Sequence, residues 1–295
     1  MVYKIQNEFL SATINSKGAE LHSLLSKTGI EHIWQRDPKY WNYCAPILFP
    51  IVGNLRDKKT IINNEEYFMD THGFLRNQEF ELFQKKNSEI SFVNTFNKDT
   101  LKLFPFKYKV IITYTIKDKT LRTAYKVINE NHEPLMFNIG GHPAFNCPLY
   151  WQDKFSDYTL TFEKEESFTS PKVEANGTLN FNEAARRYES LKSLNLDYDL
   201  FNIDTIVIPR VRSNYVRLLN KDNLGIKFSF PNYKSFAIWS PYKKQAPFIC
   251  LEPWIGYGDR YDTNYQFNKK DDLVNLKALA EFNVFYDIEI IDNKL

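Results

Sequence analysis

The sequence predicts an all-β protein, built as a large antiparallel sandwich or barrel. Many short runs, of the four to eight residues typical of strands, alternate apolar and polar side chains and end at turn signals. Aromatic residues make up 16% of the chain, with 24 Phe, 18 Tyr and 5 Trp, and they suit pleated, half-buried surfaces. Because no regular succession of helices separates the runs, a doubly wound α/β fold is excluded.

The first part of the chain indicates a series of hairpins. Turns are predicted at 15–18 (Asn-Ser-Lys-Gly) and 27–29 (Lys-Thr-Gly), where glycine and small polar residues gather. Residues 46–52 are strongly apolar but contain two prolines, which belong at sheet edges or bends. The strands expected here are 9–14, 21–25 and 31–34.

The rest of the chain continues as strands with one looser stretch. Residues 163–195 are rich in charge around an Asn-Gly turn, and we interpret them as an insertion within a single domain, 1–295. Short helices are predicted at 182–192 and 271–280. The strands expected in this part are 89–94, 108–116, 121–127, 205–208, 215–219, 225–230, 236–240, 248–251 and 281–291.

Composition excludes several classes of protein. The net charge is +2, from 38 basic and 36 acidic residues, and no basic stripe alternates with aromatics, so nucleic acid is not an expected partner. No run approaches the roughly 18 apolar residues of a membrane span, and no secretory leader opens the chain. Cys44, Cys147 and Cys250 are far apart and form no CxxC pair, which predicts free thiols in a reducing compartment, the cytoplasm.

Two proline-flanked segments are the candidates for chemistry. In 138–146 the pair Gly140-Gly141 lets the backbone pass close to another group, and Pro143 pushes His142 toward an extended conformation. In 250–254 a carboxylate, Glu252, likewise stands directly before a proline, Pro253. A histidine and a glutamate held in this way fit a general acid and base, although His142 alone also fits an ordinary turn histidine.

Other chemistries have weaker support. The five histidines form no HxH or HExxH pattern, so no metal is predicted, and a zinc site would have to be assembled in space. No GxSxG elbow is present for a serine hydrolase. A glycoside hydrolase typically needs two carboxylates that flank the glycosidic bond to be cleaved. Glu252 and Asp204 are the candidates, but nothing in the sequence pairs them.

Taken together, the segments resemble the aldose 1-epimerases, or galactose mutarotases, and most closely their LacX-like bacterial branch. The resemblance runs nearly end to end and is carried by residues 16–21 (Ser-Lys-Gly-Ala-Glu-Leu), 46–53, 71–74 (Thr-His-Gly-Phe), 138–148 and 250–260. It implies a large antiparallel β-sandwich of the galactose mutarotase-like type. It also implies a cofactor-independent isomerase whose partner is a small sugar, an aldohexose or its phosphate.

The resemblance also implies roles for individual residues. His142 falls on the catalytic acid of the family, and Glu252 falls on its base. His72 matches a second histidine that binds hydroxyls near the ring oxygen, and Asp204 matches an aspartate that holds sugar hydroxyls. Trp254 is interpreted either as a wall for the sugar ring or as a core residue.

One departure from the family concerns the residue after Gly53, where the family usually has arginine and this chain has Asn54. Arg56 follows two residues later and, if the stretch is extended, would project from the same face and reach the same hydroxyl.

Two rival functions stay open at this point. The first is a phosphosugar mutarotase, for which Arg56, Arg76 and Lys243-Lys244 are candidate phosphate ligands. The second is a non-catalytic sugar-binding protein, which Asn54 favours. A homodimer is also left open.

Overall fold

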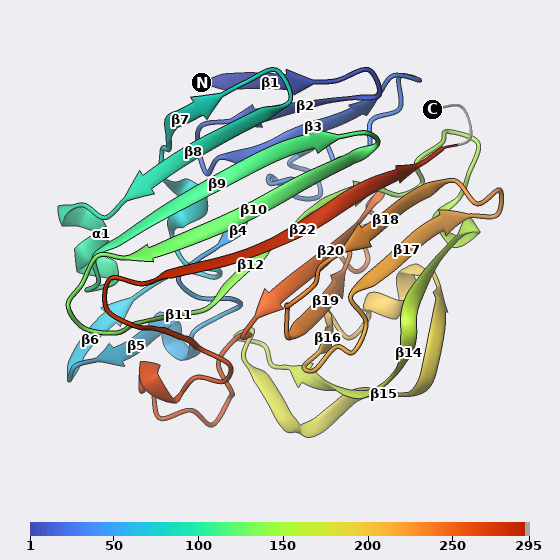
Figure 1. The fold of residues 1–295 in the computed structure, drawn as a ribbon. Helices are drawn as coiled ribbons and strands as arrows, with labels where there is room; N and C mark the ends of the chain where they lie inside the picture. The colour runs from blue at the N-terminus through green and yellow to red at the C-terminus, as the bar shows by residue number, and fades with distance from the viewer. Residues whose placement is uncertain (293–295) are drawn as a thin grey trace.

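The computed structural model describes residues 1–292 and confirms the all-β architecture (Figure 1). A nine-stranded antiparallel sheet forms the larger layer. Its strands, in spatial order, are β15 (Leu179–Asn195), β14 (Tyr158–Val173), β17 (Tyr215–Asn220), β18 (Gly225–Ser229), β22 (Glu281–Ile291), β10 (Thr120–Asn129), β9 (Tyr108–Lys117), β8 (Glu89–Thr95) and β7 (Glu81–Lys85).

A six-stranded sheet packs behind it and carries the candidate site (Figure 1). Its order is β16 (Ile206–Ile208), β19 (Ser235–Trp239), β20 (Phe248–Ile255), β12 (Ile139–Gly141) and β4 (Ile47–Leu48), and β13 (Ala144–Asn146) also pairs with β20. Every residue of β20 is buried, as expected for a strand in the middle of a sandwich. The apolar faces of the two sheets share one core, which includes residues from Ile5 to Ile290.

Smaller elements complete the fold. The first hairpins form the three-stranded sheet β1 (Val2–Gln6), β2 (Leu10–Asn15) and β3 (Glu20–Ser26), and two further pairs are β5 (Lys59–Ile62) with β6 (Glu65–Phe68) and β11 (Leu135–Phe137) with β21 (Val274–Leu276). One α-helix, α1 (Lys98–Leu103), begins with a capping box between Asn97 and Thr100. The 3-10 helices are η1 (Arg56–Lys58), η2 (Leu75–Asn77), η3 (Phe155–Asp157), η4 (Tyr198–Phe201) and η5 (Phe267–Lys269). None of the helices in the described part of the chain is long and apolar enough to cross a membrane.

The helix predicted at 182–192 is wrong, because these residues belong to strand β15. Repeated register shifts interrupt the pairing of β15 with β14, so the alternation of buried and exposed side chains that marks a strand is lost from the sequence. Cross-strand packing, such as the stacking of Phe168 on Tyr188 at 4.8 Å, stabilises the hairpin instead. The hairpin tip at Gly177 then reaches Asn54 beside the candidate site.

Two other assignments also differ from the structure. The helix predicted at 271–280 is wrong: strand β21 lies there and pairs with β11, and Asp272 and Leu279 have left-handed backbones that end a helix. In the strand predicted at 31–34, only Glu31 and Ile33 form isolated bridges.

Both glycines before His142 are closely packed, Gly140 within its own sheet and Gly141 against the larger sheet, as the close backbone approach predicted from the sequence requires. A Cβ on Gly140 would lie 2.8 Å from the Trp254 side chain, and one on Gly141 would lie 2.7 Å from the ring of Tyr286 on β22. A larger residue at Gly141 would force the two sheets apart at the point where β12 approaches β22.

We therefore expect Gly141→Ala to lower the free energy of unfolding by about 3 kcal/mol, because the buried Tyr286 ring has no space to move into. Urea denaturation measures the change. The control is Gly29→Ala, where an added methyl meets open space and only the left-handed backbone is penalised, by about 1 kcal/mol. Equal losses in the two variants would contradict the close fit.

Candidate active site

The register of two strands places His142 opposite Glu252. Gly140 pairs with Trp254 before His142, and Ala144 pairs with Cys250 after it, so the same antiparallel register sets His142 against Glu252. Directly opposed residues project from the same face of a sheet with Cβ atoms roughly 5 Å apart. The prolines that follow both residues lack an N–H and interrupt the ladder here, between β12 and β13.

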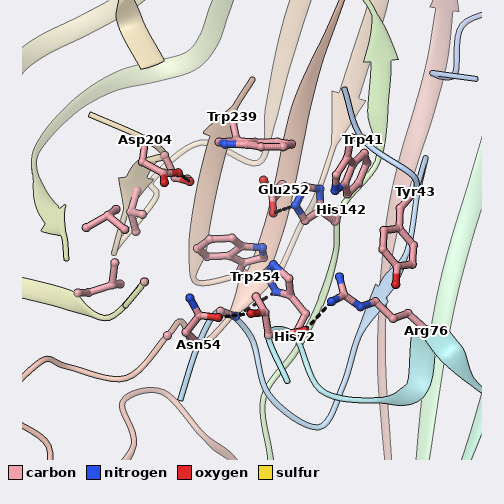
Figure 2. A pocket seen from close by; sticks show the side chains of 18 residues that line it. Trp41, Tyr43, Asn54, His72, Arg76, His142, Asp204, Trp239, Glu252 and Trp254 are labelled. Atoms are coloured by element: carbon pink, nitrogen blue, oxygen red, sulfur yellow. Dashed lines mark hydrogen bonds and ion pairs between the residues drawn. The ribbon is translucent and has the colours of Figure 1, made fainter. Parts of the chain in front are cut away.

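The two side chains meet inside a cavity of about 360 Å³ (Figure 2). The distance between His142 Nε2 and Glu252 Oε2 is 3.1 Å, and the residues are only 6% and 1% exposed. The contact does not have hydrogen-bond geometry, so Glu252 Oε2 is buried without a hydrogen-bond partner, and His142 Nδ1, on the other side of the ring, has none either. Such atoms are costly in an empty pocket and are ready to bind a polar ligand.

Burial sets the ionisation of this pair. Desolvation lowers the pKa of His142 to about 3, and the charge of Arg76 acts in the same direction. Desolvation raises the pKa of Glu252 well above 4.5, the charge of Asp204 adds to the rise, and the Trp254 indole opposes it. Both shifts favour the neutral forms, so the proton of the pair lies on the carboxyl side and the imidazole is neutral.

His72 lies beside the pair in a defined tautomer. Its Nδ1 accepts a hydrogen bond of 3.0 Å from the backbone N–H of Gly53, which places the ring proton on Nε2. The ring meets that of His142 edge to face, with centroids 5.4 Å apart. Desolvation lowers the pKa of His72 well below 6.5, and the charges of His142 and Arg76 add to this, so His72 is a neutral donor.

Three tryptophans wall the cavity (Figure 2). Trp41 stacks on the His142 ring at 4.7 Å, and Trp239 meets it edge-on at 5.9 Å. Trp254 lines the cavity and also belongs to an apolar cluster of the core. Sequence reasoning missed Trp41, Tyr43 and Trp239 as site residues, and the high aromatic content was the only signal for them.

Asn54 and Asp204 both line the cavity, as predicted for substrate-binding residues. The Asn54 carbonyl accepts a hydrogen bond from Thr71 Oγ1, and its amide donates to the backbone of Asn176 at 3.3 Å. Asp204 is exposed, and its carboxylate accepts a hydrogen bond of 2.9 Å from Thr205 Oγ1.

Arg56 does not replace the family arginine, because the chain is not extended there. It begins η1, its guanidinium donates to the backbone of Thr263 at 3.1 Å, and it lies over the Tyr265 ring. The cation that does line the cavity is Arg76, from η2. Lys243 and Lys244 lie outside the cavity lining.

Three groups in the site have spacing that also suits a metal. One ligand atom each from His72, His142 and Glu252 lie within 4.8 Å of one another, a donor set that occurs at catalytic zinc. The positive charge of Arg76 disfavours a divalent metal ion at these ligands, just as it disfavours a proton on the rings of His72 and His142. Acid/base chemistry therefore fits the site better than metal chemistry.

Comparisons with known proteins agree with the resemblance in the motifs. A family model described as Aldose 1-epimerase matches residues 1–266. The plasmid protein LacX of Lactococcus lactis subsp. lactis is 35% identical over 300 residues, which cover 99% of this chain and 100% of LacX.

Two solved structures share the fold throughout. A galactose mutarotase related enzyme from Lactobacillus acidophilus superposes with a TM-score of 0.94 at 28% identity, covering 99% of this chain and 98% of that one. A galactose mutarotase-like protein from Lactobacillus casei gives 0.92 at 30% identity, covering 99% and 100%.

The shared proton of His142 and Glu252 predicts a specific pH dependence of stability. The unfolded chain loses the Glu252 proton near pH 4.5 and the His142 proton near pH 6.5, whereas the raised pKa of Glu252 keeps a proton on the folded pair to higher pH. The unfolded state then binds fewer protons, so the free energy of unfolding falls as pH rises above 6.5, by up to about 1.4 kcal/mol per unit. Between pH 4.5 and 6.5 both states hold one proton, and the pair contributes no slope.

Urea unfolding at several pH values from 6.5 to 8.5 tests this expectation, with Glu252→Gln as the comparison. The variant has no proton on the pair in either state above pH 6.5 and should lack the downward slope. Parallel pH profiles for the two proteins would contradict the shared proton.

Proposed function

The chain belongs to the aldose 1-epimerase family, and from that premise we propose that it interconverts the α and β anomers of an aldohexose by acid/base ring opening. The observation that carries the proposal is the buried contact of 3.1 Å between His142 and Glu252 inside a cavity walled by tryptophans. A pyranose has an apolar face that packs on an aromatic ring, while its hydroxyls require polar partners such as the unpaired atoms of this site.

Ring opening requires one acceptor and one donor of a proton. In the proposed cycle the two side chains, 3.1 Å apart, first turn into hydrogen-bond alignment as the sugar enters. The proton then passes from Glu252 to His142, giving a carboxylate and an imidazolium. Glu252 then takes the proton of the C1 hydroxyl, the C1–O5 bond breaks, and O5 receives the proton of His142. The products are the open-chain aldehyde, a neutral carboxyl and a neutral imidazole.

Ring closure reverses these transfers on the other face of C1. After rotation about C1–C2, the carboxyl of Glu252 returns its proton to the C1 oxygen while His142 takes one from the C5 hydroxyl. No proton is gained or lost over the cycle. The open-chain stage has the same ionisation as the resting pair, with the proton on the carboxyl side.

The remaining polar groups orient the sugar in this proposal. His72 donates its Nε2 proton near the ring oxygen, and Asp204 accepts hydrogen bonds from hydroxyls on the other side of the pair. We also propose that residues 1–295 act as one domain, since the core joins strands from both ends of the chain. The cytoplasm is proposed as the compartment from the three free, buried cysteines.

We expect His142→Asn and Glu252→Gln each to lower kcat for anomer exchange by roughly 10²–10⁴-fold, because each removes one positioned proton transfer. Polarimetry on freshly dissolved α-D-galactose and α-D-glucose measures the rate. The controls are His132→Asn and Glu133→Gln, the same changes at exposed positions. Full activity in either site variant, or loss of activity on chelation that zinc restores, would contradict these roles.

For Asp204→Asn we expect KM to rise roughly 10-fold or more with a smaller change in kcat, because a charged acceptor of sugar hydroxyls is lost while the proton-transfer pair is kept. Initial rates over a range of hexose concentrations separate the two constants. Asp199→Asn, in the exposed η4 turn, is the matched control. A pure loss of kcat would place Asp204 in the chemistry instead.

A non-catalytic sugar-binding protein is the second candidate, and it is favoured by Asn54, which the hairpin tip at Gly177 holds in place of the family arginine. Hexose binding measured by tryptophan fluorescence, without any acceleration of anomer exchange in the wild type, would establish it.

A further inference from the structure

Arg76 is an unpaired cation beside the acid/base pair. It is the one lysine or arginine among the described residues that line the cavity. Within residues 1–292, no carboxylate lies within ion-pair distance of its guanidinium. One of its nitrogens donates to the Thr71 backbone at 2.8 Å, and its Nε is buried without a hydrogen-bond partner.

The surroundings of Arg76 hold it in place and add positive charge. The guanidinium lies over the Tyr43 ring, 4.6 Å from its centroid, which fixes the plane of the donor fork. A second cavity of about 270 Å³ shares Tyr43 and Arg76 as lining residues, and Lys17 and Arg36 line it too. Its one carboxylate, Glu20, already accepts hydrogen bonds from the backbone N–H groups of Cys44 and Ala45.

The charges of the main cavity are arranged with opposite signs at opposite sides. Asp204 and Arg76 lie on opposite sides of the His142–Glu252 pair in Figure 2. The electrostatic interactions agree with this arrangement. The charge of Arg76 lowers the pKa of both His142 and His72, whereas the charge of Asp204 raises the pKa of Glu252. In the proposed reaction His142 meets the ring oxygen and Glu252 meets the C1 hydroxyl, so the ring-oxygen side of the sugar faces Arg76.

We propose that the preferred substrate is an aldose with an anionic group, a phosphate or a carboxylate, at C6, and that Arg76 binds this group. C6 is attached to C5, which carries the ring oxygen, so its substituent extends from the side of the sugar that faces Arg76. A planar guanidinium fork matches the oxygens of either anion. This inference rests on the proposed function, because the orientation of the sugar follows from the roles of His142 and Glu252.

Pairing with an anion also serves the chemistry. Arg76 disfavours a proton on His142 in the empty site, and an anion on Arg76 offsets that charge. A charged substrate would therefore help to move the proton of the pair onto the imidazole, where ring opening needs it.

Exchange spectroscopy by NMR on anomer mixtures at equilibrium tests the proposal. D-glucose, D-glucose 6-phosphate and D-glucuronate are compared, and the same set in the galacto series, at constant ionic strength in phosphate-free buffer, with the uncatalysed rate of each sugar subtracted. For the wild type we expect kcat/KM to be at least roughly 10-fold higher for one anionic class than for the neutral hexose. Whether kcat/KM rises for the 6-phosphate or for the uronate distinguishes phosphate from carboxylate as the preferred group.

Variants of Arg76 locate the effect. Arg76→Gln should lower the anionic-to-neutral ratio of kcat/KM by roughly 10–100-fold, and Arg76→Lys should lower it less, because it keeps the charge but not the fork. Arg56→Gln, an arginine outside the cavity lining, should leave the ratio unchanged. The wild-type ratio decides the preference even if a variant fails to fold.

The possible failures are distinguishable. Catalysed exchange with a wild-type ratio near one, or a ratio that Arg76→Gln leaves unchanged, would overturn the inference while the proposed function stands. If no aldose is turned over, the proposed function fails, and fluorescence titration of the cavity tryptophans then decides. Tighter binding of the anionic sugar that is lost in Arg76→Gln would support the anion site, and equal binding in both proteins would overturn it.

Discussion

The structure depends most on one cross-strand pairing in the middle of a buried sheet. Antiparallel register alone brings an imidazole and a carboxyl from residues 142 and 252 to within 3.1 Å on one face. Two prolines interrupt the hydrogen bonding of β20 at this point, where its partner changes from β12 to β13. A site on paired strands is held more rigidly than one on loops, which suits a reaction that needs only two proton transfers.

The same burial that positions the pair also sets its charge. Taking an imidazole and a carboxyl out of water favours their neutral forms, so the resting pair holds one proton and has no net charge. An ion pair forms only when something compensates for desolvation. In the proposed reaction, sugar hydroxyls would supply part of that compensation, and an anionic substituent paired with Arg76 would supply more.

The larger sheet contributes by closing the back of the site. Tyr286 on β22 lies against Gly141, the last residue of β12, so the larger sheet packs directly on the backbone that leads into His142. The β14–β15 hairpin contributes another wall, where Gly177 contacts Asn54. The hydroxyl of Ser170 on β14 accepts a hydrogen bond of 3.0 Å from the backbone N–H of Val207 in the six-stranded sheet. Two segments far apart in the chain, β22 and the β14–β15 hairpin, thus help to form one cavity.

The sequence by itself determined the all-β class, the proline-flanked histidine and glutamate, and the need for glycine before His142, because these depend on local alternation and backbone sterics. It also pointed to His72, Asp204 and Trp254 through the resemblance to a family, and to Asn54 as the departure from it, and all four line one cavity. Tertiary structure alone decided that 182–192 is a strand and that Arg76, rather than Arg56, faces the site, since both follow from pairing and packing with distant residues. It also decided where the proton of the pair resides, because desolvation depends on what surrounds the two groups and not on their neighbours in sequence.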